Sequence, residues 1–257
     1  MQKLLYASII FLFLSCSKSS NSPLPLLSPV ESRKNIVQQI ISKQVDIQPV
    51  NMHEQLKIKT LAMTYIGVNI NSNLTFNYEY DNRGRITNIN TGQNDNFLTI
   101  KYDDDKKTVT ENEVSFKTDN EGKIMALTKE PDYQMFVYKN GYPLERSGIY
   151  LNKFDSNGNI IQSEREGVFT FEYTNFPNNI RQEIARLGAF QLNFRDTYAG
   201  KFSTNLIKKC TADKVFGMSG KDELTFDYEF DEKQRVSKMT INRLSDKRIL
   251  TYEYTYY

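Results

Sequence analysis

Residues Tyr80–Ile86 read Tyr-Asp-Asn-Arg-Gly-Arg-Ile, and this stretch decides the fold. The side chain of Asp81, at the start of a turn, can accept hydrogen bonds from the backbone amides ahead of it. Gly84, three residues later, adopts a positive φ at little cost. The pattern is typical of a short hairpin loop that combines a type I turn with a glycine bulge. We therefore predict two antiparallel strands joined by this turn.

The same pattern recurs along the chain. Its copies are Thr118–Ile124, Phe154–Ile160 and Phe230–Val236. Gln234 stands in the last copy where the others have glycine, so this turn needs a non-glycine residue in the left-handed conformation. The aspartates at positions 81, 119, 155 and 231 are separated by 38, 36 and 76 residues. Regular spacing indicates a repeat, and because the last interval is twice 38, we expect a decayed copy near residue 193.

The segments beside these turns alternate between apolar and polar residues. Leu74, Phe76, Tyr78 and Tyr80 form one face of such a segment. The same alternation occurs at Phe169–Tyr173, Leu224–Phe230 and Leu250–Tyr256. Strict alternation predicts antiparallel strands with one packed face and one solvated face. With weaker hairpins at Tyr102–Lys107 and Tyr138–Gly141, we predict about fourteen to sixteen strands in an all-β meander of repeated hairpins.

Two segments depart from the strand pattern. Asn179 is a suitable cap for a short helix near residues 179–187, with Gly188 as its terminator, and this helix would cover an open end or edge of the sheet. The stretch Asn35–Val45 fits neither the helical nor the strand period, and we expect a first strand there.

The N-terminus is typical of export. Residues 1–15 combine a basic start with an apolar run too short to span a bilayer, as a secretory signal peptide does. Phe13–Cys16 resembles the lipobox of bacterial lipoproteins, which implies a lipid attached to Cys16 and a membrane as partner. The alternative is a simple secretory signal followed by a coincidental cysteine. We predict a flexible tether over residues 16–34 and a single all-β domain over residues 35–257.

The composition limits the classes of partner and the covalent framework. The formal net charge is +2 with the basic residues scattered, so we expect no nucleic acid as partner. The chain has 16 Tyr and 16 Phe, which favour strands over helices. Cys210 is the only cysteine after Cys16, which excludes a disulfide within the domain, and we interpret it as a small buried side chain.

Candidate metal and catalytic residues all have simpler interpretations. Asp103–Asp105 resembles a calcium ligand set, but the adjacent lysines and the missing loop glycine favour a charged hairpin tip. Asp155–Asn159 is a closer mimic, with Glu166 at the bidentate position, yet the hairpin repeat already explains it. His53 is the only histidine, which leaves no histidine-based triad or zinc cluster. We expect no metal, no cofactor and no catalytic residue.

The repeated hairpins look like the tyrosine–aspartate repeats of the Rhs and teneurin type. Together with the lipobox, the chain from about Val37 to Tyr257 resembles a family of uncharacterised lipoproteins from Gram-negative bacteria, described as a domain of unknown function with a porin-like fold. The resemblance implies a long β-meander rolled into a barrel or half-barrel at the outer membrane. It brings no catalytic or binding residue. Because the strands are short and the alternate residues before Tyr257 are polar, we expect a curled sheet that does not cross the bilayer.

Three hypotheses for the function follow. The first is a membrane-anchored, non-catalytic β-domain that binds a ligand, glycan or partner protein at the cell envelope, on its periplasmic or its surface side. A concave sheet rich in Tyr could form such a binding surface, or the rings could simply fill the curl. The second is a structural or accessory subunit that docks through an exposed strand edge. The third is a hydrolase with paired carboxylates.

Overall fold

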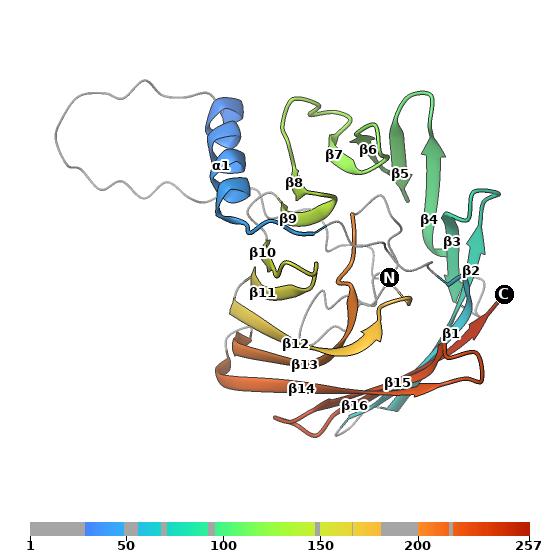
Figure 1. Ribbon diagram of the computed structural model, residues 1–257. Helices are drawn as coiled ribbons and strands as arrows, with labels where there is room; N and C mark the ends of the chain where they lie inside the picture. The colour runs from blue at the N-terminus through green and yellow to red at the C-terminus, as the bar shows by residue number, and fades with distance from the viewer. Residues whose placement is uncertain are drawn as a thin grey trace.

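The computed structural model describes residues 29–48, 56–67, 71–91, 96–146, 150–165, 167–180, 200–215 and 218–257. These residues form one helix and a sixteen-stranded antiparallel sheet (Figure 1). The sheet curls until its two edge strands meet, which makes a nearly closed barrel. The predicted all-β meander and the predicted number of strands are both confirmed.

The helix comes first along the chain and the sixteen strands follow it. Their bounds are α1 (Pro29–Lys43), β1 (Ile58–Ile66), β2 (Asn71–Tyr80), β3 (Ile86–Thr91), β4 (Asn96–Asp103), β5 (Thr108–Glu111), β6 (Val114–Thr118), β7 (Ile124–Leu127), β8 (Phe136–Lys139), β9 (Tyr142–Arg146), β10 (Tyr150–Phe154), β11 (Ile160–Arg165), β12 (Gly167–Pro177), β13 (Asn205–Val215), β14 (Met218–Phe230), β15 (Val236–Arg243) and β16 (Ile249–Tyr256).

Each strand pairs with its neighbours in sequence, except that β7 and β8 do not pair with each other. The first strand β1 pairs with the last strand β16, so the two ends of the sheet-forming chain lie side by side in the wall. The edges of the sheet are therefore β7 and β8, in the middle of the sequence. Across the described residues, one backbone hydrogen bond joins them, from Met135 N–H to the Met125 carbonyl at 2.8 Å. We call this junction the seam.

The four repeated turns are spaced evenly around the barrel. They join β2 to β3, β6 to β7, β10 to β11 and β14 to β15, so four strands separate each turn from the next. The 76-residue interval also contains four strands, β11–β14, of which β14 alone has 13 residues. The decayed copy expected near residue 193 lies outside the described residues and stays a prediction.

The aspartate of each turn holds the loop closed. Asp81 Oδ1 accepts hydrogen bonds from the backbone N–H groups of Arg83 and Arg85, both at 2.9 Å. Asp119, Asp155 and Asp231 make the same pair of bonds. A register shift lies beside every one of these turns, as a bulge requires. The left-handed position is taken by Gly84 at φ 77° and, in the fourth turn, by Gln234 at φ 58°.

These four turns lie on the same end of the barrel. Consecutive strands run in opposite directions, so turns that are separated by an even number of strands fall on one side. We call this end the turn rim. It also carries the β4–β5 and β8–β9 turns, which confirms the two weaker hairpins expected from the sequence.

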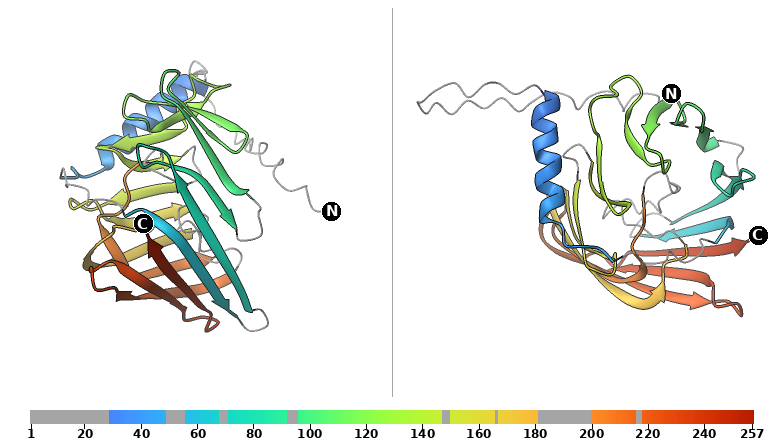
Figure 2. Two further views of the ribbon diagram at one scale, coloured as in Figure 1. Left: turned by 90° about the vertical axis from the view of Figure 1, so that its right-hand side faces the viewer. Right: turned by 45° about the horizontal axis from the view of Figure 1, so that its top comes forward.

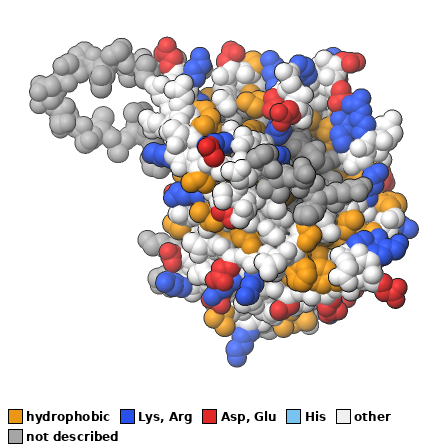
Figure 3. All heavy atoms as spheres, viewed as in Figure 1, with side chains coloured by type: hydrophobic (Ala, Val, Ile, Leu, Met, Phe, Trp, Pro, Cys, Tyr) orange, Lys and Arg blue, Asp and Glu red, His pale blue; other side chains and the backbone are white. Residues whose placement is uncertain are grey.

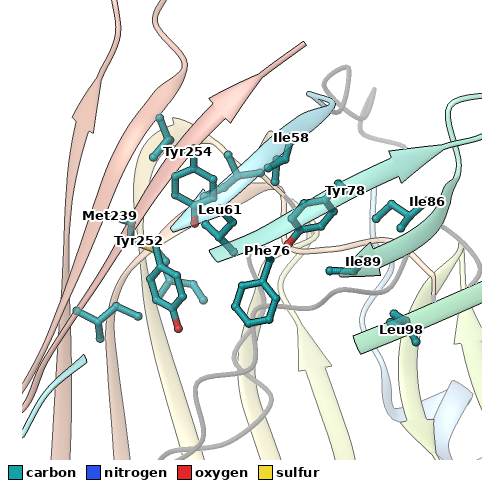
Figure 4. Close-up of a cluster of buried hydrophobic side chains, with 14 of the residues drawn as sticks. Ile58, Leu61, Phe76, Tyr78, Ile86, Ile89, Leu98, Met239, Tyr252 and Tyr254 are labelled. Carbon is teal, nitrogen blue, oxygen red and sulfur yellow. The ribbon is translucent and has the colours of Figure 1, made fainter. Parts of the chain in front are cut away.

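The apolar face of the strands points inward. Leu61, Phe76, Tyr78 and Tyr254 are buried and belong to one cluster whose members come from strands all around the wall (Figure 4). Residues from so many strands can meet only on the concave side of the sheet. The outward positions are polar and include cross-strand pairs such as Lys238 with Glu229, joined at 2.8 Å. The predicted two-faced strands are confirmed.

The first strand expected at Asn35–Val45 is wrong, because these residues belong mostly to α1. The helix lies outside the curled sheet and packs on β8 and β9 (Figure 2). Its buried side contains Arg33 as well as Val37, while Ile36 is exposed. Because the buried face of α1 includes the charged Arg33, the apolar residues alone do not show the helical period. The helix also crosses the boundary at residue 34 between the predicted tether and domain.

The second helix expected near residues 179–187 lies largely outside the described residues. Asn179 and Ile180 follow β12 and are not helical. Ile180 is buried against the barrel core. The cap and the apolar face assigned to this segment therefore remain predictions.

Arg33 of α1 binds the segments on the β8 side of the seam. Its guanidinium forms a buried ion pair with Glu145 of β9, and it donates to the carbonyl oxygens of Gln134 at 2.7 Å and Met135 at 3.3 Å. Gln134 and Met135 precede β8 in the connection from β7. One side chain of the helix thus holds both the edge strand region and the strand next to it.

Gly122 and Gly158 allow the stability cost of a strained backbone to be measured apart from the cost of a steric collision. Gly122 and Gly158 have nearly equal φ angles of 81° and 82°. A Cβ at Gly122 would meet nothing within 4 Å, whereas one at Gly158 would collide with the Tyr142 hydroxyl. We expect Gly122→Ala to lower the free energy of unfolding by about 1 kcal/mol, and Gly158→Ala to lower it by clearly more. Chemical denaturation measures both, and equal losses would contradict the packing around Tyr142.

The contacts of Arg33 predict a second stability effect. Arg33→Ala would leave Glu145 buried without its charge partner, so we expect a loss of about 3–5 kcal/mol. The double variant Arg33→Met with Glu145→Met removes both charges and should recover most of that loss. Denaturant titration of the three proteins tests this. An Arg33→Ala variant as stable as the parent would show that α1 does not hold these segments.

Candidate functional site

Five tyrosine hydroxyls tie neighbouring strands together. Each tyrosine lies on an even-numbered strand and donates to a carbonyl at or near the start of the preceding strand. The pairs are Tyr80 with Ile58 (3.0 Å), Tyr102 with Ile86 (3.1 Å), Tyr173 with Ile160 (2.8 Å), Tyr228 with Ile207 (2.6 Å) and Tyr256 with Val236 (2.6 Å). The sequence left open whether the tyrosines bind a ligand or build the barrel, and these five build the wall.

The basic residue that follows the turn glycine also has a structural role. The Arg85 guanidinium lies 4.0 Å from the centre of the Tyr102 ring and pairs with Asp81 at 2.8 Å. Arg235 does the same in the fourth turn, 4.6 Å from the Tyr256 ring and paired with Asp231. A cation over an aromatic face is attracted by the electron density of the ring. In these two turns the arginine therefore links the turn to a tyrosine of the strand that follows the hairpin, β4 for Arg85 and β16 for Arg235.

A polar hollow lies beside the first of these turns. It has a volume of about 580 Å³, which falls within the range of about 300–1,000 Å³ found for ligand pockets. Its lining comes from the β2–β3 turn, from β4, from the β4–β5 tip and from β5: Arg83, Lys101, Tyr102, Asp103, Asp104, Asp105, Thr108 and Thr110. We call it the rim hollow. Basic and acidic side chains are interspersed over the face of the molecule seen in Figure 3.

Strand register places the groups of the rim hollow on one side. Lys101 is opposite Thr110, and Asp103 is opposite Thr108, in the β4–β5 ladder. Residues two apart on a strand share a face, so both pairs project from the same side of this hairpin. The Thr110 hydroxyl is hydrogen-bonded to that of Ser115 at 2.8 Å, which fixes its position.

Two of the three carboxylates of the hollow are held by cations. Lys106 binds Asp103 at 2.9 Å, and this hydrogen bond lowers the pKa of the Asp103 carboxyl. Arg85 and Arg83 both bind Asp104 at 2.8 Å, and the hydrogen bond from Arg85 is the main cause of the lowered pKa of Asp104. Both groups are therefore ionised and fixed in direction at neutral pH.

Two charged side chains of the hollow remain available. In the part of the chain that the structure describes, the side chains of Lys101 and Asp105 have no hydrogen-bond or ion-pair partner. The hollow therefore offers a free ammonium and a free carboxylate beside fixed acceptors. This set can donate to and accept from a ligand rich in hydroxyl groups.

The other residues considered from the sequence have structural positions. Asp155 Oδ1 accepts the N–H groups of Asn157 and Asn159, so this segment is the predicted hairpin turn. Cys210 is fully buried and free, and burial raises the pKa of its thiol far above the usual range. Its interpretation as a small buried side chain is confirmed.

Cys16, His53 and Glu166 lie outside the described residues. Among the residues that the structure does describe, no group of three or more His, Cys, Asp or Glu side chains is placed to hold a metal ion. The same residues include no helix with the length and apolar character that crossing a membrane requires.

Sequence reasoning found only part of the rim hollow. It singled out Asp103–Asp105 as a charged tip, and the ion pairs of Asp103 and Asp104 confirm that interpretation. It did not find Arg83 or Lys101. The register of the β4–β5 hairpin could have placed Lys101 beside the tip, but the approach of Arg83 depends on the neighbouring turn.

The barrel resembles two solved structures. A porin-like protein from Bacteroides vulgatus ATCC 8482 superimposes with a TM-score of 0.51 at 13% sequence identity, over 79% of this chain and 99% of that chain. The fold is porin-like. A porin-like protein from Bacteroides uniformis ATCC 8492 gives a TM-score of 0.48 at 12% identity, over 80% of this chain and 100% of that chain. No protein-family model and no curated protein matches the sequence.

The porin-like fold confirms the architecture that the family resemblance implied. At this level of identity the likeness concerns the fold alone. Membership of a lipoprotein family and the relation to tyrosine–aspartate repeats stay predictions.

Proposed function

We propose that this protein is a lipid-anchored, non-catalytic binding domain of the bacterial cell envelope, and that the rim hollow takes a glycan. The observation that carries the proposal is the hollow of about 580 Å³ with free Lys101 and Asp105 side chains. Sugars present closely spaced hydroxyl groups, each of which both donates and accepts. Neighbouring ammonium and carboxylate groups complement that pattern.

The distribution of side chains over the wall, apolar inside and charged outside, supports a barrel that is surrounded by water. A barrel that crosses an outer membrane turns an apolar band of about 25 Å toward the lipid and keeps its interior polar. Here Leu61 and Phe76 point inward, while Glu229 and Lys238 point outward. A wall of this polarity gains nothing from contact with lipid chains. A separate anchor is then the means by which the domain would stay at a membrane.

The charges of the rim hollow support binding without catalysis. Glycoside hydrolysis needs a carboxylic acid whose raised pKa lets it protonate the leaving group. The pKa values of Asp103 and Asp104 are lowered, by Lys106 and Arg85 respectively. These two carboxylates hold no proton to donate near neutral pH. A hydrolase is accordingly the weakest of the three hypotheses.

Docking through a strand edge is the second candidate. The two edges of the sheet, β7 and β8, have four residues each and face each other across the seam. Short edges that face one another offer little room for an added strand. We therefore rank this hypothesis below glycan binding.

The glycan proposal is tested by binding of the full chain to a glycan array, followed by affinity measurements on the best ligand. We expect Lys101→Ala and Asp105→Ala each to weaken binding at least tenfold, because each removes one free polar group from the hollow. Lys208→Ala, at an exposed position of β13, is the matched control and should bind as the parent does. Absence of any glycan ligand, or one that both hollow variants bind equally well, would refute the proposal.

The anchor has its own test. Cells that express the chain are labelled with a radioactive fatty acid, and we expect label on the parent and none on Cys16→Ala. The variant should also be released from the membrane fraction, because two or three acyl chains supply the attachment. Retention of the unlabelled variant at the membrane would show that something other than Cys16 holds the protein there.

A further inference from the structure

Lysines from separate parts of the chain meet at the β8–β9 turn, away from the rim hollow. A Cβ added to Gly141 would lie 3.1 Å from Cε of Lys201 and 3.2 Å from Cε of Lys123. The two Cε atoms are therefore no further apart than the sum of these distances. The backbone N–H of Lys201 donates to the Gly141 carbonyl at 2.8 Å, which fixes the segment that carries it.

A third lysine nearby is already engaged. Lys139, at the end of β8, donates from Nζ to the Gln44 carbonyl at 2.7 Å and pairs with Asp46 at 2.9 Å. It therefore binds the segment that follows α1. Lys123 and Lys201 are left as the pair whose side-chain carbons lie against the turn.

Lys201 is the unneutralised member of this pair, because the two neighbouring acids, Glu121 and Asp119, both act on Lys123. In the described part of the chain Lys201 has no carboxylate within ion-pair distance, and its Nζ lies 5.3 Å from the Tyr142 ring centre. Lys123 is buried and pairs with Glu121, whose side chain is largely exposed. Burial and the charge of Lys201 lower the pKa of Lys123, against the attraction of Asp119. An anion between the two lysines would relieve this repulsion.

We propose that Lys123 and Lys201 form a binding site for a phosphate group, with Gly141 as its floor. The Glu121 carboxylate marks the place where Lys123 holds an oxyanion, and it comes from a flexible exposed side chain that a ligand can displace. A phosphate oxyanion can accept hydrogen bonds from both lysines at once, and it would supply a negatively charged partner for Lys201. Because Gly141 has no side chain, the side-chain carbons of Lys123 and Lys201 can lie against this turn.

The site goes beyond the proposed glycan function and is tested without reference to it. Calorimetric titration of the full chain with inorganic phosphate at fixed ionic strength is the first arm. Vesicles of phosphatidylcholine with and without phosphatidic acid are the second arm, because the phosphate could be free or part of a lipid headgroup. Lys201→Ala and Lys123→Met are the site variants. Lys208→Ala is the control, and far-ultraviolet spectra and melting curves check that every variant is folded.

We expect saturable binding in at least one arm, weakened at least tenfold by Lys201→Ala and by Lys123→Met and unchanged in Lys208→Ala. Glu121→Gln should bind several-fold more tightly, because it removes the competing carboxylate. Binding to free phosphate supports a soluble ligand, and binding to phosphatidic acid vesicles alone supports a headgroup. No saturable binding in either arm, or binding that both site variants leave unchanged, would overturn the proposal.

Discussion

The barrel depends on the hydrogen bonds that each turn aspartate accepts from two backbone amides. These bonds close the turn and set the bulge beside it, and the bulge sets the register of the two strands. Because side chains alternate with period two, a slip of one residue would turn a whole apolar face outward. With one such turn in every four strands, the same face is directed inward around the entire wall.

The inward apolar face determines where a ligand can be bound. Five tyrosine hydroxyls are hydrogen-bonded to the wall, as in Tyr102 with Ile86. Free polar groups remain at the turn rim, where hairpin tips bring side chains from neighbouring strands together. The apolar face of this porin-like barrel is turned inward, which is the polarity opposite to that of a barrel that crosses a membrane.

The seam is the weak point of this architecture. Fifteen of the junctions around the wall are strand ladders, whereas β7 and β8 form no ladder; among the described residues one backbone hydrogen bond, from Met135 to Met125, crosses this junction. On the β8 side of this junction, helix α1 places Arg33 between Glu145 and the carbonyls that precede β8. Burying an ion pair costs desolvation free energy, which reduces its net contribution to stability. The pair nevertheless fixes the relative position of the two segments that it joins.

The sequence by itself determined the strands, the four turns and the inward face, because these follow from local rules of turn chemistry and alternation that act within a few residues. It also located the charged tip of the rim hollow. Only the tertiary structure decided the nature of α1, the pairing of β1 with β16 and the approach of Arg83 and Lys101. Each of these depends on residues distant in sequence: Arg33 is tolerated in a buried helix face because Glu145, 112 positions later, neutralises it.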